Sequence, residues 1–144
     1  PEEVVMEGTI RTFNDEVRKD IHDSIRKKAE MIASASGATA KVEIFSDIAK
    51  VTFNEPSLTD KMVPSLERVY GKENVKITPF ITGAEDFPFF TDHAPGLYFF
   101  NGVAPDPSKA APNHSPYFFA DERNLKYGTK ALTQLAVDYL YLYK

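Results

Sequence analysis

The sequence predicts a mixed α/β fold, and three observations support this prediction. Two segments alternate apolar and polar residues with the period of a half-buried strand, and two short apolar runs between glycine and proline residues are typical of buried strands. Three stretches repeat apolar residues every three or four positions, as amphipathic helices do. The composition, 42% hydrophobic and 26% charged over 144 residues, is that of a globular domain and excludes disordered and low-complexity proteins.

The first part of the chain predicts a strand, a long helix and a second strand. Alternation over residues 4–13 predicts the first strand, with Arg11 on its polar face. Asn14 is a good N-cap for a helix that Gly37 ends, and alternation resumes over residues 40–45. We therefore expect these elements to form a compact α+β unit.

A hinge or domain boundary is expected between Asp47 and Pro56, where turn residues interrupt the pattern. Ser57 is a plausible N-cap for the next helix, and Gly71 ends it. The apolar side of this helix carries Leu58, Met62, Leu66 and Val69.

Two further strands and a closing helix are expected in the remainder. The strands cover residues 75–81 and 97–100, and loops rich in Pro, Asp, Asn and Gly cover residues 82–95 and 102–116. The closing helix opens at Asp121 and is expected to pack on a sheet. Its apolar positions are Leu125, Leu132, Leu135, Ala136, Tyr139 and Tyr143.

Charge and composition exclude several classes of function. The net charge of −4 and the absence of a Lys/Arg cluster argue against nucleic acid as a partner. No apolar run is long enough to span a bilayer, so we expect no membrane partner and a cytoplasmic location. The chain has no cysteine, which excludes disulfides and thiolate ligands within it. Residue 1 is Pro rather than Met, so the chain is expected to be part of a longer polypeptide.

His114 is the most suggestive of the three histidines. It lies between Pro112 and Pro116, which stiffen the loop, and a metal ligand or a general base benefits from such preorganisation; an ordinary loop histidine is the alternative. His22 is expected at the surface of the first helix, and His93 is expected to make a local hydrogen bond.

A second candidate is the turn after the third predicted strand. Gly83 opens it, and Glu85 and Asp86 present adjacent carboxylates that either serve a site or cap the following segment. Phosphate-binding loops, serine nucleophile elbows and zinc-binding His-Glu-x-x-His helices are absent. A metal site needs three or four ligands, so if His114 binds metal, most ligands must come from elsewhere.

Four motifs in order resemble the second half of a peptidase M20-type metal-dependent amidohydrolase. The resemblance is to the branch of N-acyl-amino-acid hydrolases, which includes hippurate hydrolases, indole-acetyl-amino-acid hydrolases and N-acetyl-diaminopimelate deacetylases. The motifs are residues 8–13 (GTIRTF), 83–87 (GAEDF), 95–100 (PGLYFF) and 113–118 (NHSPYF).

The resemblance implies two domains. Residues 1–50 would be the latter part of a two-layer α+β lid domain that mediates homodimerisation. Residues 51–144 would be the C-terminal part of an α/β catalytic domain of the zinc-peptidase type.

The resemblance also implies roles for individual residues. His114 would be the last ligand of a site for two divalent metals, Zn or Mn first and Co or Ni as alternatives. Arg11 would bind the carboxylate of the substrate, although a salt bridge at the rim is an equal alternative. Gly83, Glu85 and Asp86 would line the wall. The other ligands and the general base have no counterpart here, so no catalytic residue is assigned within this chain.

The implied function is hydrolysis of the amide bond of N-acyl amino acids or peptides by a longer chain, with this part alone inactive. Two alternatives stay open. One is a metallo-carboxypeptidase or dipeptidase of the same family, and the other is a non-catalytic dimerisation or binding module.

Overall fold

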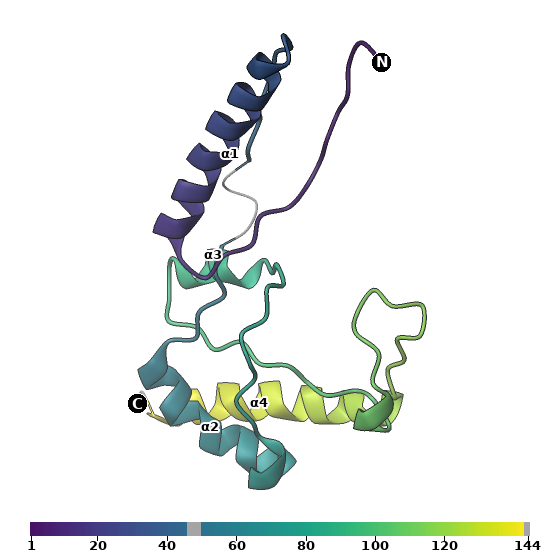
Figure 1. The fold of residues 1–144 in the computed structure, drawn as a ribbon. Coiled ribbons are helices and arrows are strands. Elements are labelled where there is room, and N and C mark those ends of the chain that lie inside the picture. Colours follow the sequence, from purple (N-terminus) through teal and green to yellow (C-terminus); the bar gives the residue numbers. More distant parts are fainter. Residues whose placement is uncertain (46–49, 143–144) are drawn as a thin grey trace. The chain divides into compact units, whose positions relative to one another are not determined.

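A computed structural model describes residues 1–45 and 50–142, and within these residues the regular elements are helices (Figure 1). The α-helices are α1 (Asp15–Ala35), α2 (Pro56–Tyr70), α3 (Phe87–Thr91) and α4 (Leu125–Leu142). Short 3₁₀ helices are η1 (Lys72–Asn74), η2 (Pro107–Lys109) and η3 (Glu122–Asn124). The chain divides into two compact units, the first made of Pro1–Phe53 with Pro79–Ala94 and the second of Asn54–Thr78 with Pro95–Lys144.

The predicted α/β fold is wrong for the part of the chain that the structure describes. None of the four expected strands forms there, so neither the two-layer α+β lid nor the α/β catalytic sheet is present. Alternation of apolar and polar residues indicates which side chains could lie on the same face of a strand. A strand also needs a neighbouring strand that forms hydrogen bonds with its backbone N–H and C=O groups. Without one, the apolar residues of the first segment lie open to water, as the 89% exposure of Met6 shows.

A side chain takes the place of a neighbouring strand beside residues 97–100. The Asn54 Nδ2 donates to the Tyr98 carbonyl at 2.8 Å, and the Tyr98 N–H donates to Asn54 Oδ1 at 2.7 Å. The Glu55 N–H adds a single backbone bond to the Gly96 carbonyl at 3.0 Å. This segment is therefore held in the second unit without a sheet.

Helix α1 begins and ends where the sequence predicts. The Asn14 side chain accepts a hydrogen bond from the Val17 N–H at 3.0 Å. At the other end Gly37 has a φ of 71°, and the Ala38 N–H returns to the Ala33 carbonyl at 2.9 Å in a Schellman arrangement. The expectation that His22 lies at the surface is wrong, because this residue is only 8% exposed.

Helix α2 starts two residues earlier than it would with Ser57 as its N-cap. The Glu55 carboxylate is the cap, and it accepts from the N–H groups of Ser57 and Leu58. Pro56 occupies the first helical position, which needs no N–H donor, so the capping residue must precede it. Gly71, with a φ of 83°, ends the helix as predicted.

Helices α2 and α4 pack together and form the buried centre of the second unit. The predicted apolar positions Leu58, Met62 and Leu66 of α2 are buried, and α4 contributes the fully buried Ala131. The Arg68 guanidinium of α2 pairs with the Asp138 carboxylate of α4. The closing helix is thus anchored by a small residue and an ion pair.

Most of the apolar face predicted for the closing helix faces water. Asp121 caps η3 rather than α4, which begins at Leu125. Leu132 is 63% exposed, because the sheet on which this face was expected to pack does not form among the residues that the structure describes. Tyr143 and Asp47, the end of this face and the start of the expected hinge, lie outside the described residues. None of the helices in the described ranges combines the length and hydropathy needed to cross a membrane.

Candidate functional site

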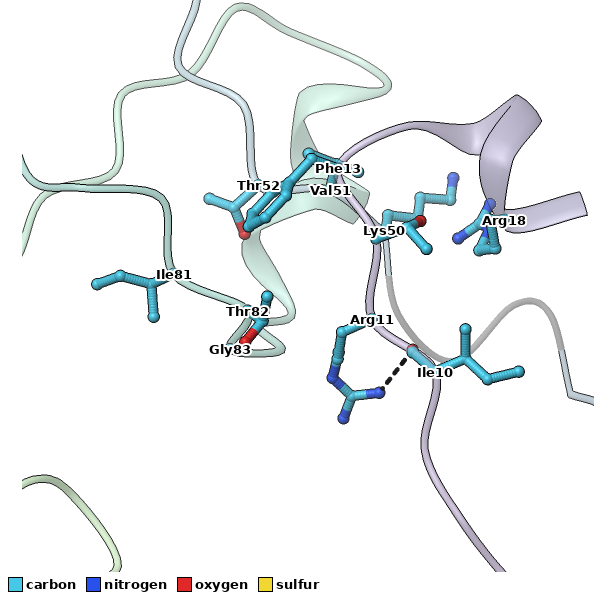
Figure 2. A pocket seen from close by; sticks show the side chains of 11 residues that line it. Ile10, Arg11, Phe13, Arg18, Lys50, Val51, Thr52, Ile81, Thr82 and Gly83 are labelled. Atoms are coloured by element: carbon cyan, nitrogen blue, oxygen red, sulfur yellow. Dashed lines mark hydrogen bonds between the residues drawn. The ribbon is translucent and has the colours of Figure 1, made fainter. Parts of the chain in front are cut away.

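The first unit contains a small cavity of about 60 Å³ (Figure 2). Its wall combines cationic, hydroxyl and apolar side chains with one glycine. The cations are Arg11, Arg18 and Lys50, the hydroxyls are Thr12, Thr52 and Thr82, the apolar residues are Ile10, Phe13, Val51 and Ile81, and the glycine is Gly83.

Three segments of the first unit bring these residues together, and one of them is residues 50–52. Residues 10–13 lead into α1, whose first turns carry Arg18. Residues 81–83 lead toward α3, and the rings of Phe13 and Phe80, with centroids 5.3 Å apart, link these two segments. The cavity therefore forms where the N-terminal segment passes the start of the Gly83 turn.

Arg11 is the cation best placed to bind an anion. Its guanidinium donates to the carbonyl of its neighbour Ile10 at 3.1 Å, and within residues 1–45 and 50–142 no carboxylate pairs with it. Figure 2 shows the side chain extending into the space beside Gly83. A guanidinium with donors to spare can bind a carboxylate through two parallel hydrogen bonds.

The other two cations already have carboxylate partners. Arg18 pairs with Asp15 at 3.0 Å. Lys50 pairs with Asp92, and its ammonium lies 5.1 Å from the centroid of the Phe89 ring. His93 makes a local hydrogen bond, as expected, from its backbone N–H to the Phe90 carbonyl at 3.0 Å.

The carboxylates of the turn do not belong to the cavity wall. Arg11 and Gly83 both line it, whereas Glu85 and Asp86 are exposed and are not among its lining residues. Asp86 precedes α3 but makes no side-chain capping hydrogen bond. No motif in the sequence pointed to Lys50, which became part of the site only through the folding of the first unit.

His114 lies in the second unit at the corner of two consecutive turns. The Ser115 N–H donates to the Pro112 carbonyl at 3.1 Å, and the Phe118 N–H donates to the Ser115 carbonyl at 3.0 Å. The first turn gives His114 a φ of 67°, the only positive φ among the described residues that are not glycine. Left-handed backbone costs a non-glycine residue energy, and such residues gather at functional sites.

The loop before His114 is also ordered by a carboxylate. Asp106 Oδ1 accepts from the Ser108 hydroxyl at 2.7 Å and from the Ser108 N–H at 3.0 Å. These hydrogen bonds, the hydroxyl first, hold the pKa of Asp106 below its usual value.

A divalent metal would find one candidate ligand here rather than a set. No group of three or more His, Asp or Glu side chains is close enough to hold a metal ion in the part of the chain that the structure describes. The exposed His114 imidazole can supply one ligand, but a stable site needs three or four. The described residues therefore do not form a metal site by themselves, and we assign them no metal-dependent step.

Comparison with known proteins gives the chain a family. Residues 2–138 match the model of "Peptidase family M20/M25/M40". Thermostable carboxypeptidase 2 of Saccharolobus solfataricus is 36% identical over 96% of this chain and 35% of its own length. N-acetylcysteine deacetylase of Bacillus subtilis is 28% identical over 95% of this chain and 34% of its own length. IAA-amino acid hydrolase ILR1-like 4 of Arabidopsis thaliana is 29% identical over 97% and 33%.

The chain spans about a third of the length of these curated relatives. No solved structure matches it significantly. Because the family model covers nearly the whole chain, the resemblance found in the motifs is confirmed, and the chain belongs to peptidase family M20/M25/M40, a family of hydrolases that act on amide bonds.

Proposed function

We propose that this chain recognises the free carboxylate of the substrate within a longer M20 hydrolase. The substrates would be N-acyl amino acids or peptides, cleaved at the amide bond next to the amino acid that bears the carboxylate. The names of the three relatives all describe removal of an amino acid or of its acyl group. An amino acid released from such an amide carries a free carboxylate, and this shared group is what the site would bind.

The observation that supports this proposal is the position of Arg11. Its guanidinium lies in the wall of a cavity and lacks a carboxylate partner in the described ranges, while Arg18 and Lys50 have theirs. A carboxylate is small enough to enter this cavity of about 60 Å³. Thr82 lines the same wall, and its hydroxyl can donate to an anion, whereas the Thr12 hydroxyl donates to the Asn14 carbonyl at 3.1 Å.

His114 would contribute one ligand to a site for two divalent metals, Zn or Mn first and Co or Ni as alternatives, with the other ligands supplied by parts of the protein outside this chain. The two turns that fix its left-handed backbone support this role, because an ordered backbone lowers the cost of holding the imidazole in place for a metal.

Residues 1–50 would belong to a lid domain that forms a homodimer, and residues 51–144 to the catalytic domain. The contribution of Glu85 and Asp86 would be to the rim of the substrate path, since both are exposed outside the cavity. We propose a cytoplasmic enzyme.

Peptides are the second candidate class of substrate beside N-acyl amino acids. The higher identity to the carboxypeptidase, 36% against 28% for the deacetylase, favours peptides. Both classes place a free carboxylate beside the scissile amide, so the role of Arg11 is the same in each.

The test is Arg11→Ala in the full-length enzyme, assayed on a peptide and on the same peptide with an amidated C-terminus. Loss of a charge-assisted hydrogen bond should lower kcat/KM for the free carboxylate roughly 10- to 100-fold. Hydrolysis of the amidated peptide, which has no carboxylate to bind, should change little. Arg26→Ala is the matched control, because Arg26 pairs with Asp23 on α1 and does not line the cavity.

An equal loss on both peptides would contradict the proposed role of Arg11. A full-length protein that hydrolyses neither peptides nor N-acyl amino acids would favour the alternative of a binding module.

A further inference from the structure

Most of the positive charge in the wall of the first unit's cavity is neutralised by carboxylate partners. Three cationic side chains line it, but Arg18 is neutralised by Asp15 and Lys50 by Asp92. The described residues of the wall and their partners therefore leave one uncompensated positive charge, that of Arg11. A site with a net charge of one attracts a single carboxylate.

Lys50 is held away from an incoming anion by two contacts. Its ammonium pairs with the Asp92 carboxylate and lies 5.1 Å from the centroid of the Phe89 ring. The ring face and the carboxylate are both favourable partners for a cation. Phe89 belongs to α3 and Asp92 directly follows it, so one short helix supplies both contacts.

Asp92 is not a lining residue, but its carboxylate pairs with the Lys50 ammonium and so brings a negative charge next to one residue of the wall. A second carboxylate on the substrate that approached Lys50 would also approach Asp92, and like charges brought close together repel. The rest of the wall is apolar or carries threonine hydroxyls, which cannot neutralise a second anion.

We propose that the Lys50–Asp92 pair makes the enzyme selective for amino acids with neutral side chains. The cavity binds the one carboxylate that every substrate has, and Asp92 disfavours substrates whose amino acid brings a second one, glutamate and aspartate. Asp92 is then a specificity-determining residue that acts by engaging Lys50. This inference rests on the proposed function, since it takes the substrate to be an amide of an amino acid.

The experiment compares two substrates of nearly the same shape, one acyl group joined to glutamine or to glutamate. With the full-length wild-type enzyme, kcat/KM should be at least roughly tenfold higher for the glutamine compound, the discrimination expected when a single charge is left unpaired. Asp92→Asn removes the repelling charge and releases Lys50. This substitution should raise kcat/KM for the glutamate compound and leave kcat/KM for the glutamine compound little changed. The ratio of the two kcat/KM values, glutamine over glutamate, should therefore fall at least roughly fivefold.

Two further variants separate charge from structure. Lys50→Gln combined with Asp92→Asn should lose the gain on glutamate, because no cation is left to receive the second carboxylate. Asp23→Asn is the matched control, since Asp23 pairs with Arg26 on α1 outside the cavity, and it should leave the ratio unchanged.

The inference is overturned if the wild-type enzyme cleaves the glutamate compound as readily as the glutamine compound. An unchanged ratio in a folded Asp92→Asn enzyme overturns it too. If that variant does not fold, the wild-type ratio alone decides. Failure of the proposed function has a different signature, namely no hydrolysis of either compound or no effect of Arg11→Ala.

Discussion

Truncating Leu66 to alanine tests whether α2 and α4 form the core of the second unit. Leu66 is 5% exposed, so nearly all of the three carbon atoms removed by Leu66→Ala come from a buried position. At about 0.8 kcal/mol per buried methylene, the lost transfer free energy is about 2.3 kcal/mol. The cavity left behind adds roughly 1 kcal/mol, which gives an expected loss of about 3 kcal/mol in the free energy of unfolding.

Leu132→Ala is the matched control, because the chemical change and the helical setting are the same. Leu132 is 63% exposed, so about a third of the transfer term applies and the loss should stay below about 1 kcal/mol. The assay is urea unfolding of the 144-residue chain, followed by far-ultraviolet circular dichroism, with equal slopes required of the three proteins. Equal destabilisation by both substitutions would refute the reasoning, since it would mean that the exposed face of α4 is buried in solution.

Two other predictions concern His114 and Asp138. His114→Ala and His114→Gly in the full-length enzyme should both lose bound metal, measured by elemental mass spectrometry, and metal content equal to wild type would contradict the ligand role. The free energy of unfolding should be about 1 kcal/mol higher for the glycine variant than for the alanine variant, because only glycine adopts a φ of 67° without strain. Hydrogen bonds from Ser65 and Gln134, together with Arg68, hold the pKa of Asp138 below its usual value. This pairing stabilises the fold above the pKa of the unfolded carboxyl group, near 4, and is lost as the pH falls through the lower folded value. Asp138→Asn should therefore lower the free energy of unfolding at neutral pH and make this free energy fall less steeply below about pH 4 than in the wild type. The measurement is urea unfolding at several pH values, and the same steepness below about pH 4 in both proteins would contradict the prediction.

The three long helices α1, α2 and α4 could be predicted from the sequence because their signals are local, whereas the short helix α3 lies in a segment predicted to be a loop. Asn14, Gly37 and Gly71 act on backbone groups within a few residues of themselves, and all three hold the positions predicted for them. The family could be predicted for the same reason, since each of its motifs is a short contiguous run. The prediction of Ser57 as the cap of α2 was wrong for a reason that is also local. Pro56 occupies the first position of the helix, so Glu55 rather than Ser57 is the capping residue.

The strands could not be predicted from alternation alone, because a strand exists only when a second segment accepts its hydrogen bonds. Residues 97–100 illustrate this, since the bonds that a neighbouring strand would make to Tyr98 come from the Asn54 side chain. The environment of His22 was missed for a related reason. A polar helix flank becomes buried when other parts of its unit cover it, and spacing along the helix carries no information on that.

By itself, the sequence determined the family, the three long helices and two candidate residues, Arg11 and His114, because short motifs and caps depend on neighbours along the chain. Only the tertiary structure decided that Arg11 shares a cavity with Gly83 while Glu85 and Asp86 lie outside it, and that Lys50 is neutralised by Asp92, 42 residues further along the chain. Charge balance in a site depends on distances through space, and residues far apart in a sequence acquire those distances only when the chain folds.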